Sequence, residues 1–120
     1  MDETSRAADA ERYIELNIEF HATLYAATGN RRLALLDEQM GKELRIYRRH
    51  GLEFGGGLAM SNEEHRGLLA AIERGDCEAA GARLEKHIQS GRDRFIRAMS
   101  ATGRLVLADH APSSPSQRKA

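Results

Sequence analysis

The sequence has little of what exported, membrane-bound or nucleic-acid-binding proteins require. Its one cysteine, Cys77, cannot form an internal disulfide, which suits a reducing compartment. No run of about 18 apolar residues occurs, and residues 1–12 are polar and acidic, so we expect neither a membrane span nor an export signal. The 18 Lys and Arg residues balance the 18 Asp and Glu residues, which leaves no excess positive charge for DNA, RNA or anionic lipid. The sequence therefore predicts a cytoplasmic protein that makes no membrane contact and does not itself bind nucleic acid.

Residues that interrupt helices are also scarce. Both prolines lie in the tail "HAPSSPSQRKA", β-branched residues are few, and Ala, Leu, Glu and Arg predominate. A chain of 120 residues is long enough for one domain with a modest core. We expect a single all-α domain over residues 1–102, followed by a Ser/Pro-rich disordered tail over residues 103–120.

Two long helices are predicted in the first half of the chain. The first runs from about Ser5, a plausible N-cap, to "TGN" at 28–30, where Gly29 supplies a left-handed end. Asn30 caps the second helix, "RRLALLDEQMGKELRIYRRHGLE", which ends at the glycine loop "FGGGLAM". The apolar residues expected to face the core are Tyr13, Leu16, Phe20, Leu24 and Ala27 in the first helix, widened by Ile14, Ile18 and Tyr25, and Leu33, Leu36, Met40, Leu44 and Tyr47 in the second.

Two further helices are predicted in the second half. "SNEEH" has the pattern of a capping box, in which Ser61 and Glu64 would satisfy the first backbone N–H groups of a helix that continues to Ile72. After Gly75, Asp76 caps the last helix, "CEAAGARLEKHIQSGRDRFIRAMSATG". The residues of this helix expected in the core are Leu84, Ile88, Phe95 and Met99.

Histidines interrupt the apolar faces of three of these helices. His21, His65 and His87 each lie among apolar residues, and Asn17 precedes His21 by one helical turn. Each buried imidazole needs a polar partner, and one divalent metal would satisfy all of them together. Imidazole nitrogens with an amide oxygen suit Zn²⁺ first, with Ni²⁺ or Mn²⁺ as alternatives. The competing interpretation is that these histidines only pack in the core and hydrogen-bond to neighbours.

Known catalytic arrangements are not readable in the sequence. A diiron bundle needs Glu three residues before His, but those positions hold Ile18, Asn62 and Leu84. There is no H-E-x-x-H, and the "GGG" at 55–57 lacks the lysine of a phosphate-binding loop. Cys77 stands at a helix start with no base placed to activate it. We therefore predict that the chain is not an enzyme.

Three motifs in order resemble a known family. "ELNIEFHATLYAATGNRRL" and "SNEEHRGLLAAIERGDCEAAGARLEKHI" are similar to the FCD domain, the C-terminal effector-binding domain of FadR-like transcription regulators in the GntR family. The resemblance covers about residues 1–100. It implies an antiparallel helical bundle, a metal held by Asn17, His21, His65 and His87, and a bound small organic acid that completes the metal shell. It also implies a homodimer that contacts DNA through a separate winged helix-turn-helix, which this chain does not contain.

The sequence departs from the family pattern at two points. Many metal-binding members carry Asp where this chain has Asn17, and a neutral amide oxygen is a weaker ligand for a dication. We therefore expect lower metal affinity and a stronger dependence on the bound acid. The match also begins partway into the domain, so the first one or two bundle helices have no counterpart, as in a fragment or a stand-alone remnant. A second chain would then cover the exposed apolar face.

A carboxylate effector also needs a cation from the protein. The second helix offers Arg45, Arg48 and Arg49, of which Arg48 lies closest to the apolar face and Arg45 next. We expect an effector-sensing domain that binds a metal and a small carboxylic acid and so modulates an attached DNA-binding domain. The alternatives are a small metal-dependent enzyme acting on an organic acid and a metal-free helical interaction domain.

Overall fold

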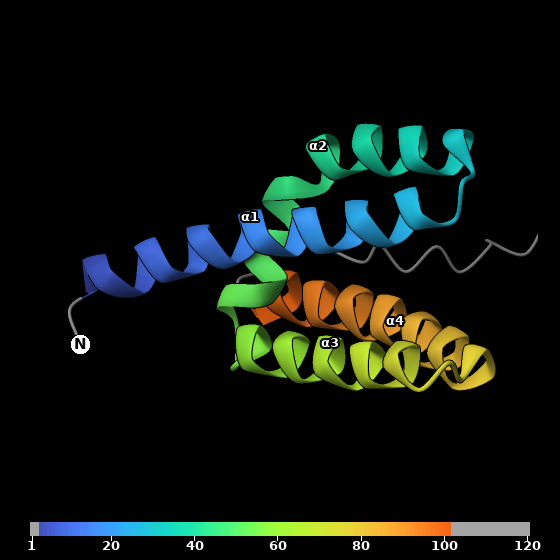
Figure 1. Ribbon diagram of the computed structural model, residues 1–120. Helices are drawn as coiled ribbons and strands as arrows, with labels where there is room; N and C mark the ends of the chain where they lie inside the picture. Colours follow the sequence, from blue (N-terminus) through green and yellow to red (C-terminus); the bar gives the residue numbers. More distant parts are fainter. Residues whose placement is uncertain (1–2, 102–120) are drawn as a thin grey trace, which may run out of the picture.

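The part of the chain that the computed structural model describes, residues 3–101, with side chains from residue 9, is built from four α-helices. They are α1 (Glu3–Ala27), α2 (Arg31–Glu53), α3 (Gly57–Glu73) and α4 (Cys77–Ala101), and no strand occurs among these residues (Figure 1). The prediction of an all-α helical bundle is confirmed. None of these helices combines the length and the apolar character that crossing a bilayer requires. The tail predicted at residues 103–120 lies outside the described residues.

The helices form two antiparallel hairpins. In Figure 1, α1 and α2 run side by side in opposite directions above α3 and α4, which do the same. The hairpins join chiefly through α2, which contacts both α4 and α3. A site at the middle of the bundle therefore draws side chains from both hairpins.

The turns inside both hairpins follow their local sequence. Gly29 and Gly75 have φ of 69°, the left-handed conformation in which glycine ends a helix at little cost. Asn30 and Asp76 each accept a backbone N–H three residues later through the side-chain oxygen, at 3.1 and 3.0 Å. These two predicted caps are confirmed, and α2 spans the predicted residues.

The predicted start of the third helix is wrong. The helix begins at Gly57, directly after Gly56 with φ of 77°, so Ser61 and Glu64 lie inside it and form no capping box. The glycines make the turn themselves, which moves the N-cap from Ser61 to Gly56, five residues earlier. Ser61 is 1 % exposed and accepts a hydrogen bond from the Tyr13 hydroxyl at 3.1 Å, while Glu64 binds side chains of α4.

The buried face of α1 also differs from the predicted one. Ala10, Ile14, Asn17 and His21 are its buried residues among the side chains described, whereas Leu16 is 45 % exposed. Apolar residues occur all round this helix, so their spacing left its rotation against the bundle open. Four other residues that were expected in the core are also more than two-fifths exposed: Leu36, Met40, Tyr47 and Ile88. The large exposed apolar residues are Leu16, Leu35, Leu36, Met40, Ile46, Tyr47, Phe54, Met60, Leu69, Ile72 and Ile88.

The centre of the bundle is polar to an unusual degree. Within the described chain, seven apolar and six polar side chains are buried, and the polar ones are Asn17, His21, Ser61, His65, His87 and Arg94. A buried polar group costs free energy unless it is bonded, so each of these needs a partner.

Gly57→Ala tests how closely α3 begins against α2. A Cβ at Gly57 would overlap the carbonyl oxygen of Gly51 and lie 3.2 Å from the Cα of Leu52. We expect this substitution to lower the free energy of unfolding by about 1–3 kcal/mol. Gly81→Ala is the matched control, because nothing lies within 4 Å of its Cβ position; it should raise stability by up to about 1 kcal/mol. Urea unfolding of both variants measures the difference, and equal stabilities would contradict the close approach.

Candidate metal and effector site

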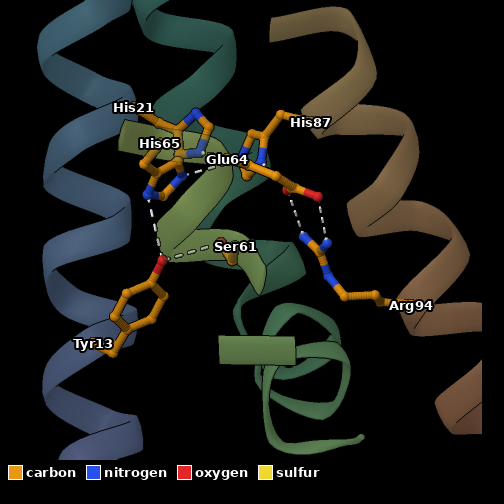
Figure 2. A network of polar contacts seen from close by, with 7 residues as sticks. All are labelled: Tyr13, His21, Ser61, Glu64, His65, His87 and Arg94. Carbon is orange, nitrogen blue, oxygen red and sulfur yellow. Dashed lines mark hydrogen bonds and ion pairs between the residues drawn. The ribbon is translucent and has the colours of Figure 1, made fainter. Parts of the chain in front are cut away.

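Three imidazoles from three helices meet at the centre of the bundle (Figure 2). The Nε2 atom of His87 on α4 lies 3.1 Å from Nε2 of His65 on α3 and 3.2 Å from Nε2 of His21 on α1. The three side chains are 6–9 % exposed. The structure therefore brings together three of the residues that the sequence analysis singled out.

Ring packing holds these imidazoles in place. His21 stacks on His87 with ring centroids 5.1 Å apart and an interplanar angle of 15°. Phe20 stacks on His65 at 4.4 Å. The nitrogens therefore converge from rings with little freedom to turn away.

Asn17, one turn before His21 on α1, is the fourth residue of the predicted set. Its side chain is 7 % exposed, and its Oδ1 atom is buried without a hydrogen-bond partner in the described structure. A buried amide oxygen without a partner costs about 1–3 kcal/mol, so the position favours something that this oxygen can bind. Asn17 and His21 both border the same cavity.

His87 is oriented by a carboxylate on its outer side. Its Nδ1 atom lies 2.6 Å from Oε2 of Glu64, and Arg94 binds the same carboxylate through two hydrogen bonds of 2.9 and 3.2 Å. The Arg94 side chain is only 6 % exposed, so Glu64 neutralises a buried guanidinium. Because a carboxylate accepts, the Nδ1 of His87 carries the proton, and its Nε2 lone pair points to the centre of the cluster.

His65 is oriented in a similar way by a hydroxyl. Tyr13 donates its hydroxyl proton to Oγ of Ser61 at 3.1 Å, and its oxygen lies 3.3 Å from Nδ1 of His65. With that proton given to Ser61, the hydroxyl oxygen can accept from Nδ1 of His65, and this tautomer leaves Nε2 of His65 unprotonated. The outer contacts of two imidazoles thus direct two Nε2 lone pairs toward each other.

Burial makes two of these imidazoles, His21 and His65, hard to protonate. It lowers the pKa of His21 to about 3, with help from the neighbouring His87, His65 and Arg48. Burial likewise lowers the pKa of His65 to about 4. Burial also acts to raise the pKa of Glu64, but hydrogen bonds from Arg94 and His87 outweigh it and lower that pKa below its ordinary value. His21 and His65 are therefore neutral and available as ligands at pH 7.

The donor set fits a borderline divalent metal. Nitrogens about 2.0–2.1 Å from a tetrahedral zinc lie about 3.3–3.4 Å apart, close to the spacings between the Nε2 atoms of this cluster. Neutral imidazoles with an amide oxygen are ligands that zinc accepts, and outer partners that hold Nδ1–H are typical of zinc-bound histidine. The unpartnered Asn17 oxygen beside them completes the fit.

A cavity of about 450 Å³ adjoins the cluster, between α2 and α4. Its walls include Asn17, His21 and His87 together with three arginines. Arg94 is paired with Glu64 and Arg92 with Asp93, whereas Arg48 has no ion-pair partner among the described residues. The structure therefore places one uncommitted cation beside the histidines. The lining residues are Asn17, His21, Leu44, Tyr47, Arg48, Gly51, Leu52, Ser61, His87, Ile88, Gly91, Arg92, Arg94 and Phe95.

Arg45, the second residue predicted to bind the effector, lies outside this cavity. It is not among the lining residues of this cavity and forms an ion pair with Glu11 of α1. Arg49 binds the same carboxylate at 2.9 Å. Arg45 and Arg49 thus tie α2 to α1, and the structure brings only Arg48 of the two predicted arginines to the cavity.

Sequence reasoning missed four residues around the cluster. Tyr13, Ser61, Glu64 and Arg94 hold the histidines from outside, and Ser61 and Glu64 were assigned to a helix cap. One signal was present for Glu64, because a carboxylate beside a metal-binding histidine is a frequent partner of another ligand. Nothing local marked Arg94, which reaches Glu64 across 30 residues of sequence.

A model of the family described as FCD domain matches residues 1–90 of this chain, which is three quarters of its 120 residues. All of the histidines in the cluster and their partner Glu64 lie inside the matched range. Neither the curated proteins nor the solved structures contain a match to the chain.

The cluster predicts how the stability of the metal-free protein depends on pH. Below pH about 6.5 the unfolded chain protonates its histidines, while His21 and His65 stay neutral in the folded state until pH about 3–4. The unfolded state then binds more protons, so the free energy of unfolding falls as the pH falls through this window. We expect the free energy of unfolding to fall by about 1–2 kcal/mol for each of the two histidines between pH 7 and pH 5. Urea unfolding with a chelator present measures this decrease. His50→Gln, outside the cluster, should leave this loss intact, and equal stability at the two pH values would contradict the assignment.

Proposed function

The chain belongs to the FCD domain family, and on that premise we propose that it is the effector-binding module of a GntR-type transcription regulator that binds a divalent metal and a small carboxylic acid. One observation carries the proposal. Three imidazoles from α1, α3 and α4 converge beside a cavity that is also lined by the amide of Asn17 and by Arg48, and the described residues offer no hydrogen-bond partner to that amide oxygen and no ion-pair partner to that arginine.

The residues that would hold the metal are His21, His65 and His87, through Nε2, and Asn17, through Oδ1. Zinc suits this set first, and nickel and manganese are the alternatives. A bound metal supplies positive charge and coordination positions for carboxylate oxygens. The amide of Asn17 is neutral and binds a dication more weakly than a carboxylate would. Metal binding should therefore depend more on the effector acid than it would with Asp at this position.

Arg48 would bind the carboxylate of the effector. Its guanidinium is planar and can donate two parallel hydrogen bonds to a carboxylate. No acidic side chain of the described region competes for it, in contrast to Arg92 and Arg94. The acid would then lie between α2, which carries Arg48, and the histidines of the other three helices.

This placement suggests how binding alters the bundle. A ligand held by Arg48 of the first hairpin and His87 of the second favours arrangements in which the hairpins are close. In a complete regulator, such a preference shifts the equilibrium of an attached winged helix-turn-helix domain, which makes the DNA contacts. We propose a homodimer for that assembly, and the exposed apolar residues of this chain support a partner surface.

The site supports binding more than catalysis. Glu64, the carboxylate nearest to the histidines, is occupied by both Arg94 and His87. A general base needs a free lone pair beside the substrate, and Glu64 faces Arg94 instead. We therefore propose a sensor and not an enzyme.

Titration of the metal-free protein with ZnCl₂ tests the metal site. We expect one equivalent to bind by calorimetry and to raise the melting temperature, because a ligand at a hundredfold excess over its dissociation constant stabilises by about 2.7 kcal/mol. His65→Gln should abolish the shift, and His50→Gln on α2 should keep it. Absence of zinc binding and of any shift in the wild-type protein would favour the metal-free interaction domain.

Glu64→Gln tests the outer support of the cluster. A neutral amide accepts less strongly from His87 and leaves Arg94 buried without its counter-charge. We expect zinc affinity to fall about 10–100-fold in competition with a coloured chelator. Glu63→Gln is the matched control, because that side chain is 76 % exposed and pairs only at the surface with Arg66, at 3.6 Å. A lower melting temperature with unchanged zinc affinity would mean that Glu64 serves stability alone.

A further inference from the structure

The cavity beside the histidines has two chemically different ends. Asn17, His21 and His87 lie at one end, together with Arg48, which is near enough to His21 to disfavour its protonation. Along α4 the cavity extends from His87 to Phe95, two helical turns or about 12 Å away. Most of its surface is apolar.

The apolar part is formed by facing side chains of α2 and α4. Tyr47 and Phe95 meet edge to face with ring centroids 5.3 Å apart. Gly91 lies one turn from both His87 and Phe95 on the same face of α4, and the one atom within 4 Å of its Cβ position is Nη2 of Arg94, at 3.9 Å, which binds Glu64. The missing side chain leaves the cavity open along its length. The apolar lining residues are Leu44, Tyr47, Leu52, Ile88 and Phe95.

We propose that the effector is a monocarboxylic acid with an apolar body, such as a medium-chain or aryl-substituted alkanoate. The carboxylate binds at the end with Arg48 and the histidines, and the body lies along the apolar walls of α2 and α4. This inference rests on the proposed function and narrows its ligand class. A cavity of about 450 Å³ has room for such a body, since pockets for small organic ligands span about 300–1,000 Å³.

The charges of the cavity disfavour an acid with a second carboxylate. Arg94 and Arg92 also border it, but Glu64 neutralises the buried Arg94 through two hydrogen bonds, and Arg92 is an exposed side chain that contacts Asp93 through Nε. A second carboxylate placed along the α4 wall would leave water for the surroundings of Leu52 and Phe95 without a free cation. An apolar body at the same place is stabilised when it leaves water, because burying apolar surface is favourable.

Matched pairs of acids test the inference on the zinc-loaded protein. Butanoate and succinate have four carbons each, and hexanoate and adipate have six, so each pair differs only in the second carboxylate. By calorimetry we expect hexanoate to bind about 15-fold more tightly than butanoate, because each of its two additional buried methylenes contributes about fourfold. We expect each monocarboxylate to bind at least about tenfold more tightly than its dicarboxylate.

Two variants locate the chain-length effect. Ile88→Ser should remove most of the preference for hexanoate over butanoate, because Ile88 lines the apolar wall while being 53 % exposed. Ile46→Ser is the matched control: Ile46 is 59 % exposed on α2 and does not line the cavity. Arg48→Gln should weaken all the acids by a similar factor, whereas Arg45→Gln, outside the cavity, should not.

The outcomes separate this inference from the proposed function. Tighter binding of succinate and adipate, or equal affinity for butanoate and hexanoate, would overturn the apolar class and leave an acid sensor in place. Binding of no acid at all would overturn the proposed function as well. The protein could instead form a concentration-dependent dimer that Ile88→Ser weakens and that hexanoate does not affect. That result would mean that a second copy of the chain, and not a ligand, covers the apolar wall.

Discussion

The convergence of three imidazole nitrogens constrains everything around it. Nε2 of His87 lies 3.1 Å from Nε2 of His65 and 3.2 Å from Nε2 of His21, and burial lowers the pKa of His21 and His65. Unprotonated nitrogens at that spacing present lone pairs to one another, an arrangement that a shared cation relieves. The outer contacts to Glu64 and Tyr13 determine which nitrogen of His87 and His65 faces inward. The centre of the bundle is thus organised for binding at a cost to its own stability.

The apolar core that must offset this loss of stability is small. Close packing at the centre is replaced by histidines, an amide and a paired arginine, and many large apolar side chains remain at the surface. The contacts between the hairpins run mainly through α2, whose inner face meets α4. A ligand that joins α2 to the histidines would therefore stabilise the contact between the two hairpins, which is the coupling that the proposed sensor requires.

The arginines of α2 show how one helix divides its roles. Arg45 and Arg49 are neutralised by Glu11 of α1 and hold the first hairpin together, whereas Arg48 lines the cavity beside His21 and has no acidic partner in the described part of the chain. Three residues along a helix rotate a side chain by nearly a full turn, yet Arg45 and Arg48 border different surfaces. The difference arises because α1 and α4 contact α2 from different sides.

The sequence by itself determined the helical class, the two hairpin turns and three of the residues that meet at the centre. Those features depend on contacts within about four residues: glycine at positive φ, side-chain caps at Asn30 and Asp76, and histidines set among apolar residues. Tertiary structure alone decided three contacts. Ser61 accepts a hydrogen bond from Tyr13, Glu64 binds both His87 and Arg94, and Arg48 but not Arg45 lines the cavity. These contacts span 23 to 48 residues of chain in the case of Ser61 and Glu64. They depend on the rotation of each helix about its axis, which the apolar residues spread round α1 could not specify for that helix.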